Sequence, residues 1–201
     1  MKRMGFLLLL IFLAATTTTV YHLTQKADIL YHKGHDLFVK SDYKGAIPFL
    51  TRSVSEDPEN REALMELAYS LLWTGESKKS IDLFQKLLLK EPDSIRTRKA
   101  LASAYSWNKE YAKAEELFLG VIAARSEDFE AKKKLAEVYT WDQRYEKAKD
   151  ILLPILKDRP SDVRAKFLYA KALQYSGQTE EAARIYRELL NGEKSPEMEG
   201  K

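Results

Sequence analysis

The sequence contains no cysteine, and its 201 residues include only eight glycines, six prolines and three histidines. Without cysteine, the chain can form no disulfide framework, no cysteine-based zinc cluster and no thiol nucleophile. The same absence excludes a lipid-modified N-terminal cysteine as a membrane tether. The scarcity of glycine and proline leaves few residues for β-turns, so helices are the simpler expectation.

An excess of charge of one sign is lacking as well. The chain has 33 basic and 30 acidic residues, mixed along its length, for a net charge of +3. Nucleic acid is therefore not expected as the main ligand, because it would need a clustered basic face. The sequence also lacks a Ser-His-Asp arrangement, a glycine-rich phosphate loop and an isolated group of carboxylates. We expect neither catalysis nor a cofactor.

The few histidines do not predict a metal site. His32 and His35 are three residues apart, and Asp28 precedes His32 by about one helical turn. Two histidines and one carboxylate are too few ligands, and His22 lies in or beside the N-terminal segment. These side chains are expected on a solvated helix face.

The longest apolar run lies at the N-terminus, where Lys2 and Arg3 precede the segment FLLLLIFLAA at 6–15. A basic start followed by a short apolar run and small residues is typical of a secretory signal. Residues 1–23 are therefore predicted to be a signal peptide or an uncleaved membrane anchor, and the poor cleavage pattern slightly favours the anchor. In both cases we expect the rest of the chain outside the cytoplasm, anchored to the inner membrane or released into the periplasm.

After the N-terminal segment, the sequence is built from a repeated segment. The segment LASAYSWNKEYAKAEELF, Leu101–Phe118, recurs 34 residues later as LAEVYTWDQRYEKAKDIL, Leu135–Leu152. Such a fixed period is typical of an array of helical hairpins. After a short linker at 24–26, five units follow without a gap: 27–60, 61–94, 95–128, 129–162 and 163–196. The polar tail at 197–201 is predicted to be disordered.

Small and large residues recur at fixed positions of these units. Small residues stand at position 8: Gly34, Ala68, Ala102, Ala136 and Ala170. They also stand at position 20: Ala46, Ser80, Ala114, Ala148 and Ala182. Larger residues stand at position 24: Leu50, Phe84, Phe118, Leu152 and Tyr186. The small residues allow two helices to approach closely, and the larger ones fill the space beside them.

This pattern resembles the tetratricopeptide repeat family over residues 27 to about 190. The resemblance implies an all-α fold, a right-handed α-solenoid of tandem helix-turn-helix hairpins that acts as an interaction scaffold. In such units the first helix lines the concave face, chiefly through positions 2, 5, 9, 12 and 13. Carried over, the resemblance implies a partner groove that includes Tyr69, Trp73, Lys99, Ser103, Trp107, Lys133, Glu137, Trp141, Phe167, Lys171 and Tyr175. Tyr31, His35 and Phe38 would continue it in the first unit.

Aromatic residues recur at position 13, where Trp73, Trp107 and Trp141 stand one repeat apart and Tyr175 follows. Such a row either packs the apolar side chains of an extended protein segment or stacks on successive sugar rings. Alternatively, each ring packs at its hairpin turn against the adjacent repeat.

The leading functional hypothesis is a non-enzymatic scaffold of the cell envelope that binds a partner segment in the groove. The alternative is a periplasmic module that contacts polysaccharide, because the third and fourth units are similar to repeats in bacterial exopolysaccharide export proteins. At the C-terminal edge, Ile185, Tyr186, Leu189 and Leu190 either pack within the last unit or expose an apolar surface for self-association or a partner.

Overall fold

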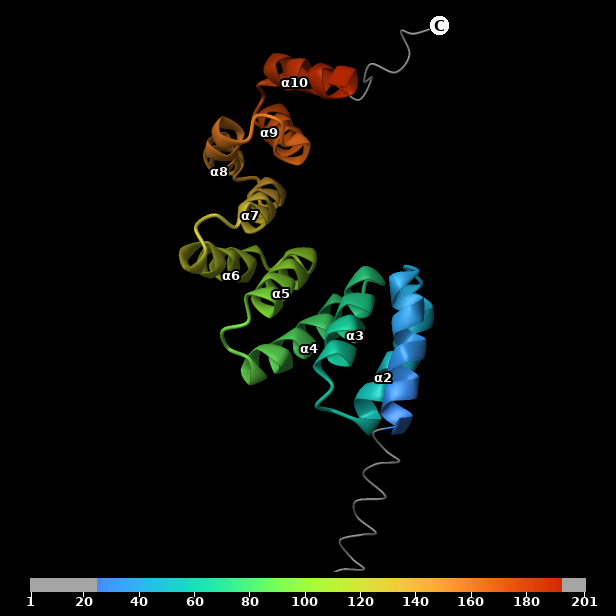
Figure 1. The fold of residues 1–201 in the computed structure, drawn as a ribbon. Coiled ribbons are helices and arrows are strands. Elements are labelled where there is room, and N and C mark those ends of the chain that lie inside the picture. The colour runs from blue at the N-terminus through green and yellow to red at the C-terminus, as the bar shows by residue number, and fades with distance from the viewer. Residues whose placement is uncertain (1–24, 193–201) are drawn as a thin grey trace, which may run out of the picture. The chain divides into compact units, whose positions relative to one another are not determined.

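The computed structural model describes residues 25–192, and within this range it is built of helices and loops without a strand (Figure 1). A helix covers residues 25–39. Nine helices follow it in this range: α2 (Tyr43–Glu56), α3 (Arg61–Trp73), α4 (Ser77–Lys90), α5 (Ile95–Trp107), α6 (Tyr111–Ala124), α7 (Phe129–Trp141), α8 (Tyr145–Asp158), α9 (Val163–Tyr175) and α10 (Thr179–Gly192). The predicted all-α class, an α-solenoid of tandem helical hairpins, is confirmed.

The predicted signal or anchor at 1–23 and the predicted tail at 197–201 lie outside the described residues. Between residues 25 and 192, every helix is too short or too polar to cross a bilayer.

The chain divides into two compact units, Met1–Thr97 and Arg98–Lys201. In the first unit, α3 packs against both α2 and α4. In the second unit, α7 packs against α6, α8 and α9, and α9 packs against α8 and α10. In three hairpins, the first helix therefore lies beside its own partner helix: α3 beside α4, α7 beside α8 and α9 beside α10. This is the arrangement that the repeat pattern predicts.

The alternation of small and large residues builds the core of each hairpin. Position 24 is occupied by side chains with no exposed surface in four hairpins: Leu50, Phe84, Phe118 and Leu152. The fifth residue at this position, Tyr186, is only half-buried. The need for a small residue at position 8 is clearest at Gly34, where an added Cβ would lie 2.7 Å from Leu50 Cγ. The predicted close approach of the paired helices is thus confirmed.

The hairpin turns repeat one backbone conformation. Residue 15 of each unit has a positive φ, namely Ser41, Gly75, Lys109, Gln143 and Gly177, at 61°, 90°, 62°, 59° and 87°. This left-handed conformation commonly follows a helix and suits glycine best. Three of the first helices begin with a side-chain N-cap: Asn60, Asp128 and Asp162 accept hydrogen bonds from backbone N–H groups of α3, α7 and α9. These caps fix where the first helix of each hairpin begins.

Candidate functional site

The residues predicted for the partner groove lie on the first helices of four consecutive hairpins. They are distributed over α3, α5, α7 and α9: Tyr69 and Trp73; Lys99, Ser103 and Trp107; Lys133, Glu137 and Trp141; Phe167, Lys171 and Tyr175. The structure brings four of them together in one pocket and gives several of the others different surroundings.

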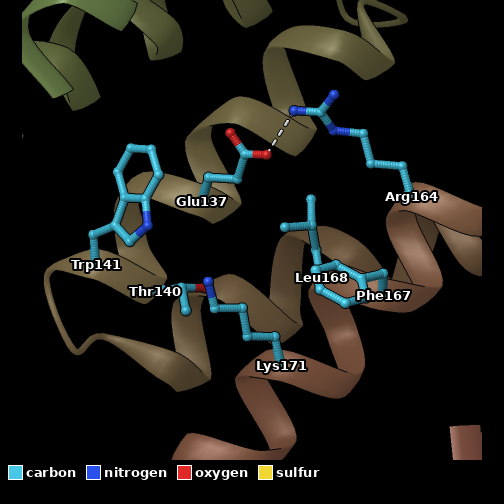
Figure 2. Close-up of a pocket in the computed structure, with 7 residues that line it drawn as sticks. All are labelled: Glu137, Thr140, Trp141, Arg164, Phe167, Leu168 and Lys171. Carbon is cyan, nitrogen blue, oxygen red and sulfur yellow. Dashed lines mark hydrogen bonds and ion pairs between the residues drawn. The ribbon is translucent and has the colours of Figure 1, made fainter. Parts of the chain in front are cut away.

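A pocket of about 320 Å³ lies between α7 and α9 (Figure 2). We call it the α7–α9 pocket, and it is lined by Glu137, Thr140, Trp141, Arg164, Phe167, Leu168 and Lys171. Sequence reasoning missed three of these residues: Thr140, Arg164 and Leu168. The first two stand at positions 12 and 2 of their units, which the family resemblance assigns to this face, so the repeat register was a usable signal. No such signal marks the buried Leu168.

Glu137 is already paired within the protein. Its Oε1 accepts a hydrogen bond from Arg164 Nη2 at 2.7 Å, and its Oε2 lies 3.0 Å from the ammonium of Lys134. The hydrogen bond from Arg164 to Glu137 raises the pKa of the guanidinium, so Arg164 keeps its charge. Two cations thus hold one carboxylate, which leaves this wall of the pocket without a free negative charge.

Lys171 differs from these groups because it has no carboxylate partner among the residues that the structure describes. Its neighbours in the pocket are the half-exposed rings of Trp141 and Phe167 and the buried side chain of Leu168. Aromatic walls beside an unpaired ammonium suit a ligand that carries an apolar group next to a carboxylate. This combination is the chemical character of the α7–α9 pocket.

Two predicted groove lysines have a structural role instead. Lys99 donates to Asp128 at 2.8 Å, and Lys133 donates to Asp162 at 3.0 Å. Each aspartate is also the N-cap of the next first helix, so each pair joins one hairpin to the helix that follows it. Burial acts to raise the pKa of both carboxyls, but the lysine and the backbone N–H groups outweigh it and lower both pKa values.

The aromatic row is interrupted in the second compact unit. Trp107 and Trp141 meet edge to face, with ring centroids 6.4 Å apart, and Trp107 is 61% exposed. Tyr175 instead stacks on Tyr145 of α8, with centroids 5.8 Å apart. A space of only about 10 Å³ lies beside the two tryptophans, lined also by the predicted groove residue Ser103. This space is too small for a sugar ring, since one water molecule already needs about that volume.

Trp73 has different surroundings from the other tryptophans. In the first compact unit its ring stacks on Tyr69 at 5.1 Å and on Phe38 at 5.7 Å, and it lies 4.4 Å from the ring of Tyr43. Such a cluster joins α3 to the preceding hairpin and stabilises their packing. The structure therefore separates the packing role of Trp73 from that of Trp141, which lines the α7–α9 pocket, and of Trp107, which contacts Trp141.

The histidine region forms a small polar cluster. His35 Nδ1 lies 2.7 Å from Glu66 Oε1, and the Tyr31 hydroxyl donates to the same oxygen at 3.3 Å. Burial and the nearby Glu66 charge raise the pKa of Tyr31 to about 12. Throughout residues 25–192, no group of three or more His, Asp or Glu side chains could hold a metal ion.

Comparison with protein families gives one match. A family model described as tetratricopeptide repeat matches residues 38–104 and 108–172. No curated protein matches the chain.

Solved structures with similar folds are numerous, and three illustrate the likeness. A crystal structure of a MamA protein shares 24% identity over 88% of this chain and 97% of its own, with a TM-score of 0.68. MamA from Desulfovibrio magneticus RS-1 shares 17% identity over 86% and 97%, with a TM-score of 0.72. A tetratricopeptide repeat protein from Parabacteroides merdae shares 22% identity over 85% and 68%, with a TM-score of 0.70. At these identities the likeness is one of fold.

Proposed function

The chain belongs to the tetratricopeptide repeat family, and from that premise we propose that it is a non-enzymatic scaffold that binds a segment of a partner protein in the α7–α9 pocket. Repeat proteins of this kind present extended binding surfaces formed by successive units. Binding of protein or peptide partners is the general role of the family, and the pocket is the specific place that we assign to it here.

The observation that carries the proposal is the free Lys171 ammonium between the exposed rings of Trp141 and Phe167. Lys99 and Lys133 are neutralised by aspartates, and Glu137 is neutralised by two cations. The partner segment is therefore expected to place an apolar side chain against the rings and a carboxylate against Lys171.

We place this scaffold in the cell envelope because of the N-terminal segment. Its order of Lys2 and Arg3, an apolar run and small residues supports an inner-membrane anchor, with the repeats outside the cytoplasm. If the segment is cleaved, the repeats are released into the periplasm. Alkaline phosphatase fused after Lys201 would be active outside the cytoplasm, and an inactive fusion beside active cytoplasmic β-galactosidase would contradict the assignment.

The binding proposal is tested with the full chain crosslinked in membranes and then purified. The groove variant carries Trp141→Ala and Lys171→Glu, which remove one aromatic wall and reverse the free charge. A matched control carries Leu89→Ala, because Leu89 is 82% exposed on α4, outside the pocket. We expect at least one partner protein to crosslink to the wild type and the control but not to the groove variant.

Identical crosslinked proteins from all three chains would contradict the pocket assignment. A peptide-display library selected on the wild type provides the direct check of the ligand chemistry. Selected peptides should be enriched in an aromatic or leucine residue beside Asp or Glu, and this preference should disappear on the groove variant.

Contact with polysaccharide is the second candidate function, favoured by the exposed faces of Trp107 and Trp141. The narrow space beside these rings leaves only their outer faces for stacking on sugars. Titration with envelope oligosaccharides, followed by tryptophan fluorescence, tests this candidate, with Trp107→Ala and Trp141→Ala chains as controls. Fluorescence that no oligosaccharide changes would rule it out in favour of a protein partner.

A further inference from the structure

Helices α9 and α10 are the last two helices of the described chain and pack against each other (Figure 1). A second pocket lies between them. This edge groove has a volume of about 600 Å³ and is lined by Val163, Arg164, Phe167, Tyr186, Leu189 and Leu190. Val163 is 60% exposed and Leu190 is 63% exposed, although both are apolar. Because adjacent apolar side chains on a surface indicate an interaction site, the edge groove needs an explanation beyond the α7–α9 pocket.

The preceding hairpin shows which element covers the equivalent groove inside the chain. In the preceding hairpin, α7 and α8 form the equivalent surface, and α9 packs against both of them. Leu152 and Ile155, the counterparts of Tyr186 and Leu189, are 0% and 1% exposed there. The edge groove therefore continues an interface that already recurs within the chain. One more helix would pack in this groove as α9 packs against α7 and α8.

One substitution separates the edge groove from its internal counterpart. The internal surface has Lys133 at position 5, which binds the N-cap aspartate of the incoming helix, Asp162. Lys99 and Asp128 repeat this arrangement one hairpin earlier. At the edge, position 5 is Phe167, so the start of an incoming helix meets an aromatic ring instead of an ammonium group. An acidic N-cap, which the internal surfaces select, meets no lysine at this position, and the cation that lines the edge groove, Arg164, is already bound to Glu137.

We propose that the edge groove binds an amphipathic helix of another protein, one that has an apolar residue where the internal helices have the N-cap aspartate. The bound helix should bury small and apolar residues at the positions equivalent to the buried stripe of α9, which consists of Ala165, Leu168 and Ala172. Helix α10 carries Glu180, Glu181, Arg184, Arg187 and Glu188. This near-neutral mixture gives no basic surface to attract an anionic membrane, so a protein helix is the better match.

A second copy of the chain is a poorer occupant. Its first helix, at residues 25–39, would have to enter the groove as α9 enters the internal one. The positions of the α9 stripe are there occupied by Ile29, His32 and Asp36, all exposed. Burial of Asp36 in an apolar groove would leave a desolvated charge without a partner. The segment that follows α10, EKSPEMEGK, offers Met198 as its one large apolar side chain and cannot supply such a stripe.

The test uses two synthetic peptides that copy residues 161–176, one with the native Asp162 and one with Asp162→Leu. A side-chain lactam on the outer face of each peptide holds both in helical form, which circular dichroism verifies. Fluorescence anisotropy then measures their binding to the full chain. We expect the leucine peptide to bind about tenfold more tightly, equivalent to about 1.4 kcal/mol.

The reciprocal variant, Phe167→Lys, recreates the internal ammonium and should reverse the order, so that the aspartate peptide binds more tightly. Leu190→Glu should abolish binding of both peptides without disturbing the core, because this side chain is exposed.

A chain with both Trp141→Ala and Lys171→Glu should bind the peptides normally, which separates the edge groove from the α7–α9 pocket. Leu119→Glu, at an exposed site on α6, is the matched control for Leu190→Glu.

Absence of peptide binding by the wild type, or equal binding by Leu190→Glu, would overturn the proposal. So would an order of affinities that Phe167→Lys does not reverse. Sedimentation of the full chain adds an independent outcome: a dimer that Leu190→Glu dissociates, together with no peptide binding, would show that a second copy fills the edge groove instead.

Discussion

The ammonium of Lys133 lies 3.0 Å from Oδ2 of Asp162, while Oδ1 of the same carboxylate accepts the N–H of Ala165 at 2.9 Å. One aspartate therefore caps α9 and ties it to α7, the first helix of the preceding hairpin. Lys99 and Asp128 form the same arrangement one repeat earlier. Because Lys133 is only 12% exposed, the pair is better shielded from water than an ordinary surface ion pair.

The first prediction separates the two roles of Asp162. Asp162→Ala removes both the helix cap and the ion pair, and should lower the free energy of unfolding by about 2 kcal/mol. Asp162→Asn keeps an oxygen that can cap α9 but removes the charge, and should cost about half as much. Urea unfolding followed by circular dichroism measures both. Equal losses for the two variants would mean that the cap contributes nothing.

The second prediction concerns the loss of stability at acidic pH. The pKa values of Asp128 and Asp162 lie below the ordinary value of 3.8, because their lysine and backbone partners outweigh the effect of burial. The unfolded chain therefore binds more protons in this range, so stability rises with pH. The contribution is complete above about pH 5 and is lost as the pH falls through 4 and below.

A chain with both Asp128→Asn and Asp162→Asn should lose less stability than the wild type between pH 5 and pH 3. Urea midpoints measured at each pH provide the comparison. Parallel curves for the two chains would show that these carboxyls do not drive the acid sensitivity.

The repeat register predicted more of the core than of the site. Positions 8, 20 and 24 are set by local spacing, and residues such as Ala114 and Phe118 are indeed fully buried. The roles of Lys99 and Lys133 depend on partners 29 residues away. Each lysine at position 5 precedes an aspartate at position 34, and this joint occurrence was the available signal. The charge of a single side chain does not reveal whether another repeat neutralises it.

The tryptophans show a similar limit. Their common position 13 suggests a common role, yet the packing differs because the residues around them differ. Trp73 meets Phe38 and Tyr43 from the preceding hairpin, whereas Trp107 meets Trp141 and is largely exposed. Repeat position predicts which face a side chain occupies, but the neighbouring rings decide whether it packs or remains free to bind.

The third prediction follows from this difference. Trp73→Ala removes a ring that contacts three other aromatic residues, and should destabilise the protein by about 2 kcal/mol. Trp107→Ala removes a 61% exposed ring and should change stability by only about 0.5 kcal/mol. Chemical denaturation monitored by circular dichroism distinguishes the two. A Trp107→Ala loss as large as that of Trp73→Ala would assign both rings to packing.

The fourth prediction concerns the hairpin turns. Gln143 has a φ of 59°, whereas the equivalent Gly75 has a φ of 90°. A non-glycine residue in this left-handed region destabilises the folded state by about 1–2 kcal/mol. Replacing it with glycine removes this strain, but the greater conformational freedom of glycine in the unfolded chain cancels about half of the gain. Gln143→Gly should therefore raise the free energy of unfolding by about 0.5–1 kcal/mol, and Gly75→Gln should lower it by a similar amount. Thermal unfolding of both variants checks the opposite signs, and a change of the same sign in both would contradict the explanation.

The last prediction tests the close approach of paired helices with two glycines in helices. Gly34 faces Leu50, whose Cγ and Cδ2 would lie 2.7 Å from an added Cβ, whereas nothing lies within 4 Å of a Cβ at Gly120. Alanine favours the helix by about 1 kcal/mol at either site, but at Gly34 the overlap with a fully buried leucine should outweigh this gain.

Gly34→Ala should therefore destabilise the protein by about 1–2 kcal/mol, while Gly120→Ala should stabilise it by up to about 1 kcal/mol. Denaturant unfolding of the two single variants measures the contrast directly, with helix propensity acting equally in both. If Gly34→Ala were also stabilising, Leu50 would have room to move, and the small residue at position 8 would not be required for the helices of the first hairpin to pack.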